Sequence, residues 1–154
     1  MGARDILEIG TSNGYSTRWL ADAVAPNGGT VTTVEMAPAT LRMARENVAA
    51  CGLGRYIEQV EGDAGQLLAR SGDSSCDVLF LDSERTEYVG WWPDIRRVLI
   101  VDNATSHAAE MAPFMQAVAA EAGFSTALVT VGKGECVASR EADMARYWAG
   151  WRER

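Results

Sequence analysis

The sequence predicts an α/β domain built on a mostly parallel sheet, and three observations support this class. Short runs of β-branched and other apolar residues alternate with segments whose apolar residues recur at helical spacing. An early apolar run, Leu7–Ile9, gives way to Gly10, small polar residues and Gly14 before a helical pattern begins. The 154 residues, 47% of them hydrophobic, suffice for one domain with a buried core, so residues 1–154 are expected to form a single unit.

Seven strands and five covering helices follow from these patterns. The expected strands are Ile6–Ile9, Val31–Val34, Tyr56–Val60, Val78–Leu81, Val98–Val101, Ala127–Val131 and Cys136–Ala138. The expected helices, on both faces of the sheet, are Ser16–Val24, Ala39–Ala50, Gln66–Arg70, Glu87–Arg97 and Ala108–Ala122. The short glycine-bearing connection Gly132–Gly134 favours a hairpin, which makes strand seven antiparallel.

The C-terminal stretch 139–154 is expected to form a helix with an aromatic stripe. Met144, Tyr147 or Trp148, and Trp151 fall on one helical face. We expect this stripe to pack on the chain's own sheet, with a subunit contact in a homodimer as the alternative.

Composition narrows the class of partner. A formal charge of −7 and a pI near 4.7 argue against nucleic acid, since proteins that bind the phosphate backbone concentrate Lys and Arg. Three widely spaced cysteines form neither a metal-knuckle pattern nor an even disulfide framework, which suits a reducing compartment. The start MGARD carries no signal-peptide hydrophobic region, and no run is long enough to span a membrane. These features predict a cytoplasmic protein with a small-molecule partner and no membrane association.

The segment Gly10–Ser16 is the first candidate binding site. Ligands of open α/β sheets bind beyond the carboxyl ends of the strands, where helix N-termini present unpaired N–H groups. Gly10 allows a turn and a close approach of a ligand to the backbone, Gly14 keeps the helix start close to the sheet, and Glu8 could face an ammonium group. The residues Thr11, Ser12 and Asn13 between the glycines depart from the G-x-G-x-x-G spacing, which disfavours a pyrophosphate.

Two further acids follow at successive strand ends. Glu35 ends the second strand, where a carboxylate can accept hydrogen bonds from two ribose hydroxyls. Gly62-Asp63-Ala64 ends the third strand, where an adenine edge would lie. Glu35 alone could equally be an ordinary exposed acid, but the order of the signals along the chain favours a ligand that contains adenosine.

Together with the stretches FLDSERTEY and VDNATSH, these residues resemble the small bacterial S-adenosylmethionine-dependent O-methyltransferases related to catechol and caffeoyl-coenzyme A O-methyltransferases. The resemblance runs from Ile6 to about Ser139. It implies a Rossmann-like class I methyltransferase fold, S-adenosylmethionine as cofactor, and methyl transfer to oxygen. It also implies cofactor-binding roles: the methionine part for Glu8, Gly10, Thr11, Ser12, Asn13, Gly14 and Ser16, the ribose for Glu35, and the adenine end for Asp63 and Ala64.

A metal site is predicted where the fourth and fifth strands end. Asp82 follows VLFL, and Asp102 and Asn103 follow VLIV, so the three side chains should converge at one edge of the sheet. Such oxygen ligands suit Mg²⁺ or another divalent cation, and the resembling family uses matching Asp, Asp and Asn ligands. A cation bridging two substrate oxygens would favour the ionised form and orient it, with Asp82 also beside the cofactor. The plainer alternative is that Asp102-Asn103 only starts a helix and Asp82 caps a loop.

The sequence departs from the resembling family at its catalytic base. The family has a lysine three residues after the first metal aspartate, whereas this chain has Arg85, which stays protonated and can only orient or stabilise an anion. His107 is therefore the reserve candidate for a base or a substrate contact, with a helix-start role as its alternative. Lys133, the only lysine, could overhang the substrate or simply be an exposed hairpin residue.

The approach to the metal site has two further features. Only 19 residues separate Asp82 from Asp102, which is tight for a crossover that needs about 10–12 residues including its helix. Within this connection, Tyr88, Trp91 and Trp92 could stack on a planar phenolic acceptor, although packing is the commoner use of such residues.

The sequence therefore predicts an enzyme: a Mg²⁺-assisted O-methyltransferase acting on a small catechol-like or phenolic hydroxyl. The alternatives are a metal-independent methyltransferase of the same fold and a non-catalytic cofactor-binding module. The identity of the acceptor, the general base and the oligomeric state are left open by the sequence.

Overall fold

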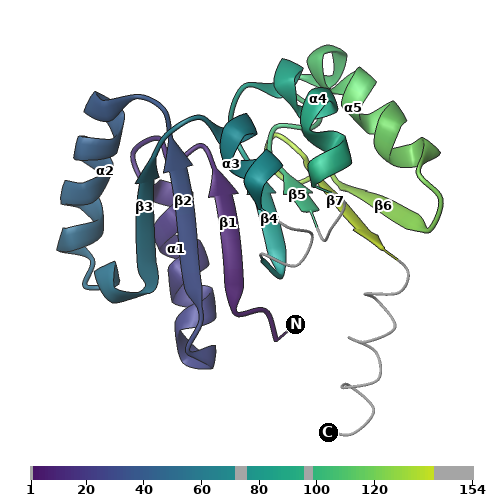
Figure 1. Cartoon of the computed structure of the whole chain (residues 1–154). Helices are drawn as coiled ribbons and strands as arrows, with labels where there is room; N and C mark the ends of the chain where they lie inside the picture. The colour runs from purple at the N-terminus through teal and green to yellow at the C-terminus, as the bar shows by residue number, and fades with distance from the viewer. Residues whose placement is uncertain (1, 72–75, 96–98, 141–154) are drawn as a thin grey trace, which may run out of the picture.

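A computed structural model of the chain describes residues 2–71, 76–95 and 99–140, which form one seven-stranded sheet (Figure 1). The strand order is β3-β2-β1-β4-β5-β7-β6. β7 runs antiparallel to both of its neighbours, while the other paired strands run parallel. The strands are β1 (Asp5–Ile9), β2 (Thr30–Glu35), β3 (Ile57–Glu61), β4 (Val78–Leu81), β5 (Leu99–Val101), β6 (Phe124–Val129) and β7 (Glu135–Arg140). The predicted α/β class and antiparallel last strand are confirmed.

Helices cover both faces of this sheet (Figure 1). They are α1 (Tyr15–Val24), α2 (Pro38–Ala50), α3 (Ala64–Arg70), α4 (Tyr88–Trp91) and α5 (Ala108–Ala120), with 3-10 turns η1 (Ala25–Asn27), η2 (Gly54–Tyr56), η3 (Arg85–Glu87) and η4 (Trp92–Asp94). On one face, Ala21 and Val24 of α1 pack with Ile6 of β1. Because side chains alternate along a strand, Glu8 shares this face, whereas Leu7 belongs to the cluster on the opposite face.

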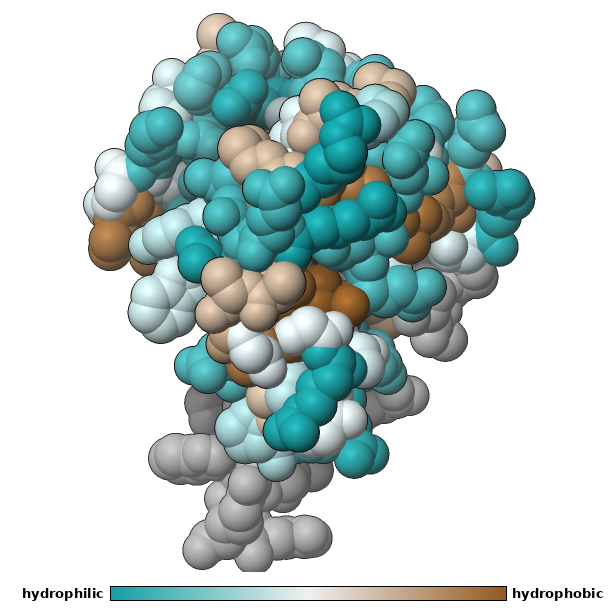
Figure 2. Space-filling view, turned by 90° about the vertical axis from the view of Figure 1, so that its left-hand side faces the viewer, coloured by the Kyte–Doolittle hydropathy of each residue, from teal (hydrophilic) through white to brown (hydrophobic). Residues whose placement is uncertain are grey.

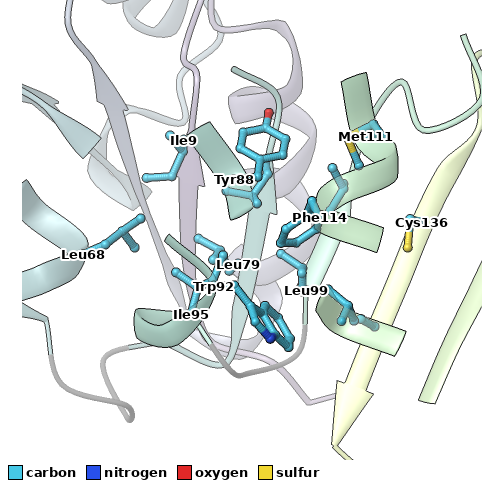
Figure 3. Close-up of a cluster of buried hydrophobic side chains, with 14 of the residues drawn as sticks. Ile9, Leu68, Leu79, Tyr88, Trp92, Ile95, Leu99, Met111, Phe114 and Cys136 are labelled. Carbon is cyan, nitrogen blue, oxygen red and sulfur yellow. The ribbon is translucent and has the colours of Figure 1, made fainter. Parts of the chain in front are cut away.

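The larger core cluster lies between the sheet and α3, α4 and α5 (Figure 3). Phe114 of α5 meets the rings of Tyr88 and Trp92 edge to face, each with ring centroids 5.7 Å apart. Edge-to-face pairs of buried rings stabilise a core beyond their buried area. This aromatic cluster fixes the short α4 segment against the sheet and so fixes the loop that follows β4.

Two elements differ from the sequence-based prediction by three residues or more at one end. The expected helix Glu87–Arg97 is broken into η3, α4 and η4, since Pro93 has no backbone N–H to continue an α-helical ladder; residues 96–98 lie outside the described part. The strand expected at Ala127–Val131 is instead β6, Phe124–Val129, which starts directly after Gly123 (φ 80°) and pairs Phe124 with Arg140 of β7. Pairing with β7 decided these bounds, and single-strand propensity could not reveal it.

The sheet edge at β3 is an ordinary exposed surface. Viewed from the side of β3 and α2, the molecule is mainly hydrophilic with scattered hydrophobic residues (Figure 2). Glu58 and Glu61 of β3 are exposed there. Across the described residues, every helix is too short or too polar to cross a membrane. The predicted aromatic helix at 139–154 falls, from residue 141 on, outside the described residues.

Candidate functional site

The loop between β1 and α1 is held by backbone contacts to β2 and to the end of β4. The N–H groups of Gly10 and Thr11 both donate to the carbonyl oxygen of Val34, at 3.0 and 3.3 Å. Gly10 has φ 104°, and a Cβ on it would collide with the carbonyl oxygen of Asp82. The prediction gave close approach of a ligand as the reason for this glycine, and the structure adds a reason within the chain: two strand ends meet there.

Glu8 of β1 holds this loop through side-chain hydrogen bonds. Its carboxylate accepts hydrogen bonds from the hydroxyls of Ser16 (2.5 Å), Thr33 (2.6 Å) and Thr17. The side chain is 0% exposed, and burial raises the pKa of its carboxyl despite these hydrogen bonds. Glu8 is thus placed to fix the start of α1, with its oxygens already engaged by the protein.

Glu35 joins the same loop to the end of β2. One carboxylate oxygen accepts from the N–H of Ser12 (3.1 Å) and the other from the N–H of Ala37 (2.9 Å). Asn47 of α2 adds a hydrogen bond to the carbonyl oxygen of Asn13 (2.9 Å). Glu35 therefore points toward the Gly10 bend, as the predicted site requires.

Asp63 and Ala64 stand at the start of α3. The Asp63 carboxylate caps this helix by accepting from the N–H of Gln66 (2.8 Å), and Ala64 packs against the core. A Cβ on Gly65 would sit 3.0 Å from the indole nitrogen of Trp91, so α4 meets α3 at this point. Both predicted residues lie at the expected strand end but outside the cavity wall described below.

The structure brings Asp82, Asp102 and Asn103 together. Leu81 of β4 pairs with Val101 of β5, which sets the two aspartates side by side at the same rim. The Asn103 amide nitrogen donates to an oxygen of Asp82 (3.0 Å), and the Asn103 backbone N–H donates to Asp102 (2.6 Å). The tight crossover of 19 residues thus closes with Asp102 beside Asp82.

These residues carry charge that is only partly balanced. Burial and the neighbouring Asp102 raise the pKa of Asp82, while Arg85, Asn103 and Lys133 act in the opposite direction. Asn103 is 6% exposed, and its amide oxygen finds no hydrogen-bond partner among the described residues. Within residues 2–71, 76–95 and 99–140, no three His, Cys, Asp or Glu side chains already surround a common point as metal ligands.

The candidate catalytic residues take different positions. Arg85 forms an ion pair with Glu110 of α5 (3.5 Å) and faces Asp82. His107 is the residue before α5; its Nδ1 lies 2.9 Å from the hydroxyl of Ser106. Lys133 is exposed in the β6–β7 turn, where its carbonyl oxygen accepts from Thr105. Of Asp82, Arg85 and His107, only Asp82 lines the cavity of about 440 Å³ described below.

Glu135 is a site residue that the sequence-based prediction missed. It begins β7, and its carboxyl meets that of Asp102. Burial, Asp102 and Asp82 together raise the pKa of Glu135 to about 7. The signal in the sequence was its place directly after the predicted hairpin turn, which returns the chain to the ligand side of the sheet.

One cavity of about 440 Å³ joins the loop to the acidic rim. Its wall is formed by Thr11, Ser12, Asn13, Tyr15, Ser16, Trp19, Leu20, Phe80, Asp82, Asp102 and Glu135. Tyr15 and Trp19 are 61% and 63% exposed, so aromatic surface lies at this cavity. The structure thus places two of the separately predicted sites, the loop and the two aspartates, in one space.

Tyr88 and Trp92 pack in the core, as the commoner use of such residues predicts, and the alternative that they stack on an acceptor is wrong. Both side chains are buried in the core, at 0% and 5% exposure, and the Tyr88 hydroxyl accepts from the N–H of Ser83 (2.6 Å). Through this hydrogen bond, Tyr88 positions the loop that follows Asp82. Trp91 is partly buried against the same core. Burial in the core explains the aromatic residues at this point of the sequence.

Comparison with known proteins identifies the family of this chain. The profile of a family described as "Methyltransferase domain" matches residues 7–104. A catechol O-methyltransferase of Mycobacterium tuberculosis is 36% identical over 107 residues, which cover 66% of this chain and 48% of that protein. One of Niastella koreensis is 33% identical over 110 residues, covering 66% and 49%. The chain thus spans about half the length of these curated relatives.

Solved structures extend the likeness to most of the chain. An O-methyltransferase from Bacillus cereus in complex with SAH superimposes with a TM-score of 0.76 and 27% identity, covering 90% of this chain and 74% of that one. The O-methyltransferase TomG from Streptomyces achromogenes in complex with SAM gives 0.75 and 28%, with the same coverage. Since the family profile matches more than half of the sequence, including the β1–α1 loop, Asp82 and Asp102, the chain belongs to the methyltransferase domain family.

Proposed function

We propose that this chain transfers the methyl group of S-adenosylmethionine to a hydroxyl oxygen of a small catechol-like or phenolic acceptor, assisted by Mg²⁺ or another divalent cation. The observation that carries the proposal is the single cavity whose wall combines the β1–α1 loop with Asp82 and Asp102. The similarity to proteins named catechol O-methyltransferase supports the reaction type and the class of acceptor.

The loop fits the methionine part of the cofactor. The α1 helix begins after Gly14 (φ 78°), which offers no side-chain cap to its N-terminus. The N–H of Tyr15 donates to the side-chain oxygen of Asn13 (3.1 Å), and the helix N-terminus attracts a carboxylate through its dipole and its remaining N–H groups. Thr11, Ser12, Asn13 and Ser16 would bind this part, while Glu8 and Glu35 would hold the loop in shape. Glu35 would also bind the ribose, because its carboxylate keeps acceptor sites beyond its two backbone hydrogen bonds. Asp63 and Ala64 would lie toward the adenine end.

The acidic rim fits a hard divalent cation. Asp82, Asp102 and Asn103 present oxygen atoms, the donors that Mg²⁺ prefers, and the buried Asn103 amide oxygen has no partner among the described residues. When bound, the cofactor supplies an electrophilic methyl group and the cation favours the ionised form of the acceptor hydroxyl.

The residues of the chain then divide the remaining tasks. Asp82 and Asp102 orient the acceptor molecule through their carboxylates. The loop residues hold the methyl donor next to it, because both groups of residues line the same cavity. Arg85 remains protonated, which fits it to balance the charge of Asp82 and not to accept a proton.

Two measurements test the cofactor-binding loop and the acidic rim separately. Isothermal titration with S-adenosylmethionine tests the loop, and methylation of a catechol panel with and without EDTA tests the rim. Asp102→Ala should lower methylation about 100-fold with cofactor binding retained. Asp22→Ala, an exposed acid of α1, is the matched control. Absence of cofactor binding would refute the methyltransferase proposal, and activity indifferent to EDTA and to Asp102→Ala would remove the metal from it.

A metal-independent methyltransferase is the second candidate. Asp82 accepts a hydrogen bond from the Asn103 amide (3.0 Å), and the acids of the described residues do not surround one point. Full turnover in EDTA, with cofactor binding intact, would favour this candidate.

A further inference from the structure

Glu135 at the start of β7 lies directly opposite Asp102, which follows the neighbouring strand β5. In the antiparallel pair of β5 and β7, Ile100 faces Val137 and Val101 faces Cys136, so the next pair in register is Asp102 and Glu135. Side chains directly opposite each other in such a pair lie on the same face with Cβ atoms about 4.5–5.5 Å apart. Asp82 lies on the other side of Asp102, next to it at the end of β4. Three adjacent strands therefore deliver one carboxylate each to the same rim.

These carboxylates face the same cavity, and few positive charges balance them. Asp82, Asp102 and Glu135 all line its wall. Two cations, Arg85 and Lys133, act on Asp82, and Arg85 is already paired with Glu110. Like charges that share a partly buried space destabilise each other unless a cation or a proton intervenes.

Unpartnered oxygen atoms are the second, independent observation. One carboxylate oxygen of Glu135 is buried and has no hydrogen-bond partner in the described part of the chain. The same holds for the amide oxygen of Asn103, a residue that is 6% exposed and whose amide nitrogen contacts Asp82. Buried acceptors without donors are costly, and a cation would satisfy both.

We propose that Glu135 is a fourth oxygen ligand, alongside Asp82, Asp102 and Asn103, for a divalent cation in this cavity. The inference rests on the metal-assisted form of the proposed function and assigns to this chain a ligand from β7 in addition to those from β4 and β5. No three acids of the described residues surround one point in the structure, so binding requires these side chains to converge on the cation. A third carboxylate raises the negative charge of the site and thereby its affinity for a hard cation.

Titration with Mn²⁺ alone, followed by the loss of the free-ion electron paramagnetic resonance signal, tests this without any turnover. Glu135→Gln keeps the size of the side chain and removes its charge; we expect the Mn²⁺ affinity to fall about tenfold or more. Glu58→Gln on the exposed edge strand β3 changes the net charge equally and should shift the affinity less than twofold. Glu135→Asp, which keeps the charge on a shorter side chain, should give an intermediate loss and serves if Glu135→Gln fails to fold.

The outcomes separate this inference from the proposed function. Equal Mn²⁺ affinity in wild type and Glu135→Gln, or an equal decrease in Glu135→Gln and Glu58→Gln, overturns the role of Glu135 and leaves the three-residue site intact. No Mn²⁺ binding by the wild type overturns both this inference and metal assistance. A parallel titration with S-adenosylmethionine reports on the methyltransferase proposal in each case.

Discussion

Two groups of acids flank the cavity, one at the ends of β1 and β2 and one at the ends of β4, β5 and β7, and the acids are used in opposite ways. On the side of β1 and β2, Glu8 accepts three hydroxyl hydrogen bonds and Glu35 accepts two from backbone N–H groups. On the side of β4, β5 and β7, the acids meet one another, and Glu135 keeps a buried oxygen without a partner among the described residues. A carboxylate that accepts several hydrogen bonds from the protein holds the loop in shape, whereas carboxylates that face one another are the ones for which we propose cation binding.

The largest expected effect concerns the contact where the two rims meet. Gly10→Ala would force a Cβ against the carbonyl oxygen of Asp82 and impose φ 104° on a residue with a side chain. We expect a loss of about 3 kcal/mol or more in the free energy of unfolding, together with loss of S-adenosylmethionine binding. Urea denaturation and calorimetric titration measure the two effects.

Gly52→Ala is the matched control for this substitution. Gly52 also has a positive φ, 72°, but a Cβ there would meet nothing within 4 Å. The cost should be about 1 kcal/mol, with cofactor binding unchanged. An equal cost at both positions would show that backbone conformation, and not the contact between the rims, makes Gly10 necessary.

The second prediction concerns Glu8, at the rim formed by β1 and β2, and the pH dependence of the free energy of unfolding. Burial raises the pKa of Glu8 above 4.5 in the folded state, so the folded chain retains a proton there that the unfolded chain releases. Stability from this group is full below pH 4.5 and is lost as pH rises through the folded pKa, at up to about 1.4 kcal/mol per pH unit. Glu8→Gln carries no such proton, and its amide can still pair with hydroxyls, which both donate and accept.

Denaturation of Glu8→Gln and wild type across pH 4 to 8 measures this slope. The variant should gain on the wild type as pH rises, while Glu46→Gln on the exposed face of α2 should follow the wild type throughout. Parallel curves for Glu8→Gln and wild type would mean that the three hydroxyls offset the cost of burying the charge.

The two rims also differ in how far the sequence predicts them. The loop residues and the three residues Asp82, Asp102 and Asn103 are all at strand ends, and strand ends in a parallel sheet follow from the pattern of β-branched runs and glycines. Glu135 depends on the register of an antiparallel pair, which no local pattern specifies. The core roles of Tyr88 and Trp92 depend on Phe114, 22 or more residues away, so the sequence favours packing for them without identifying the partner.

The smallest expected effect concerns Glu35, at the rim formed by β1 and β2, and tests whether its carboxylate holds the loop or contacts the ligand. Both oxygens of Glu35 accept from backbone N–H groups, of Ser12 and Ala37, and a glutamine offers one acceptor where two are needed. Glu35→Gln should cost about 1 kcal/mol, or about 2–4 °C in the unfolding midpoint. Glu61→Gln, the exposed residue paired with Glu35 across β2 and β3, should cost almost nothing. If Glu35→Gln weakens S-adenosylmethionine binding while the midpoint stays unchanged, Glu35 contacts the ligand directly and does not act by holding the loop, and the contrast between the two rims would then reduce to Glu8 alone.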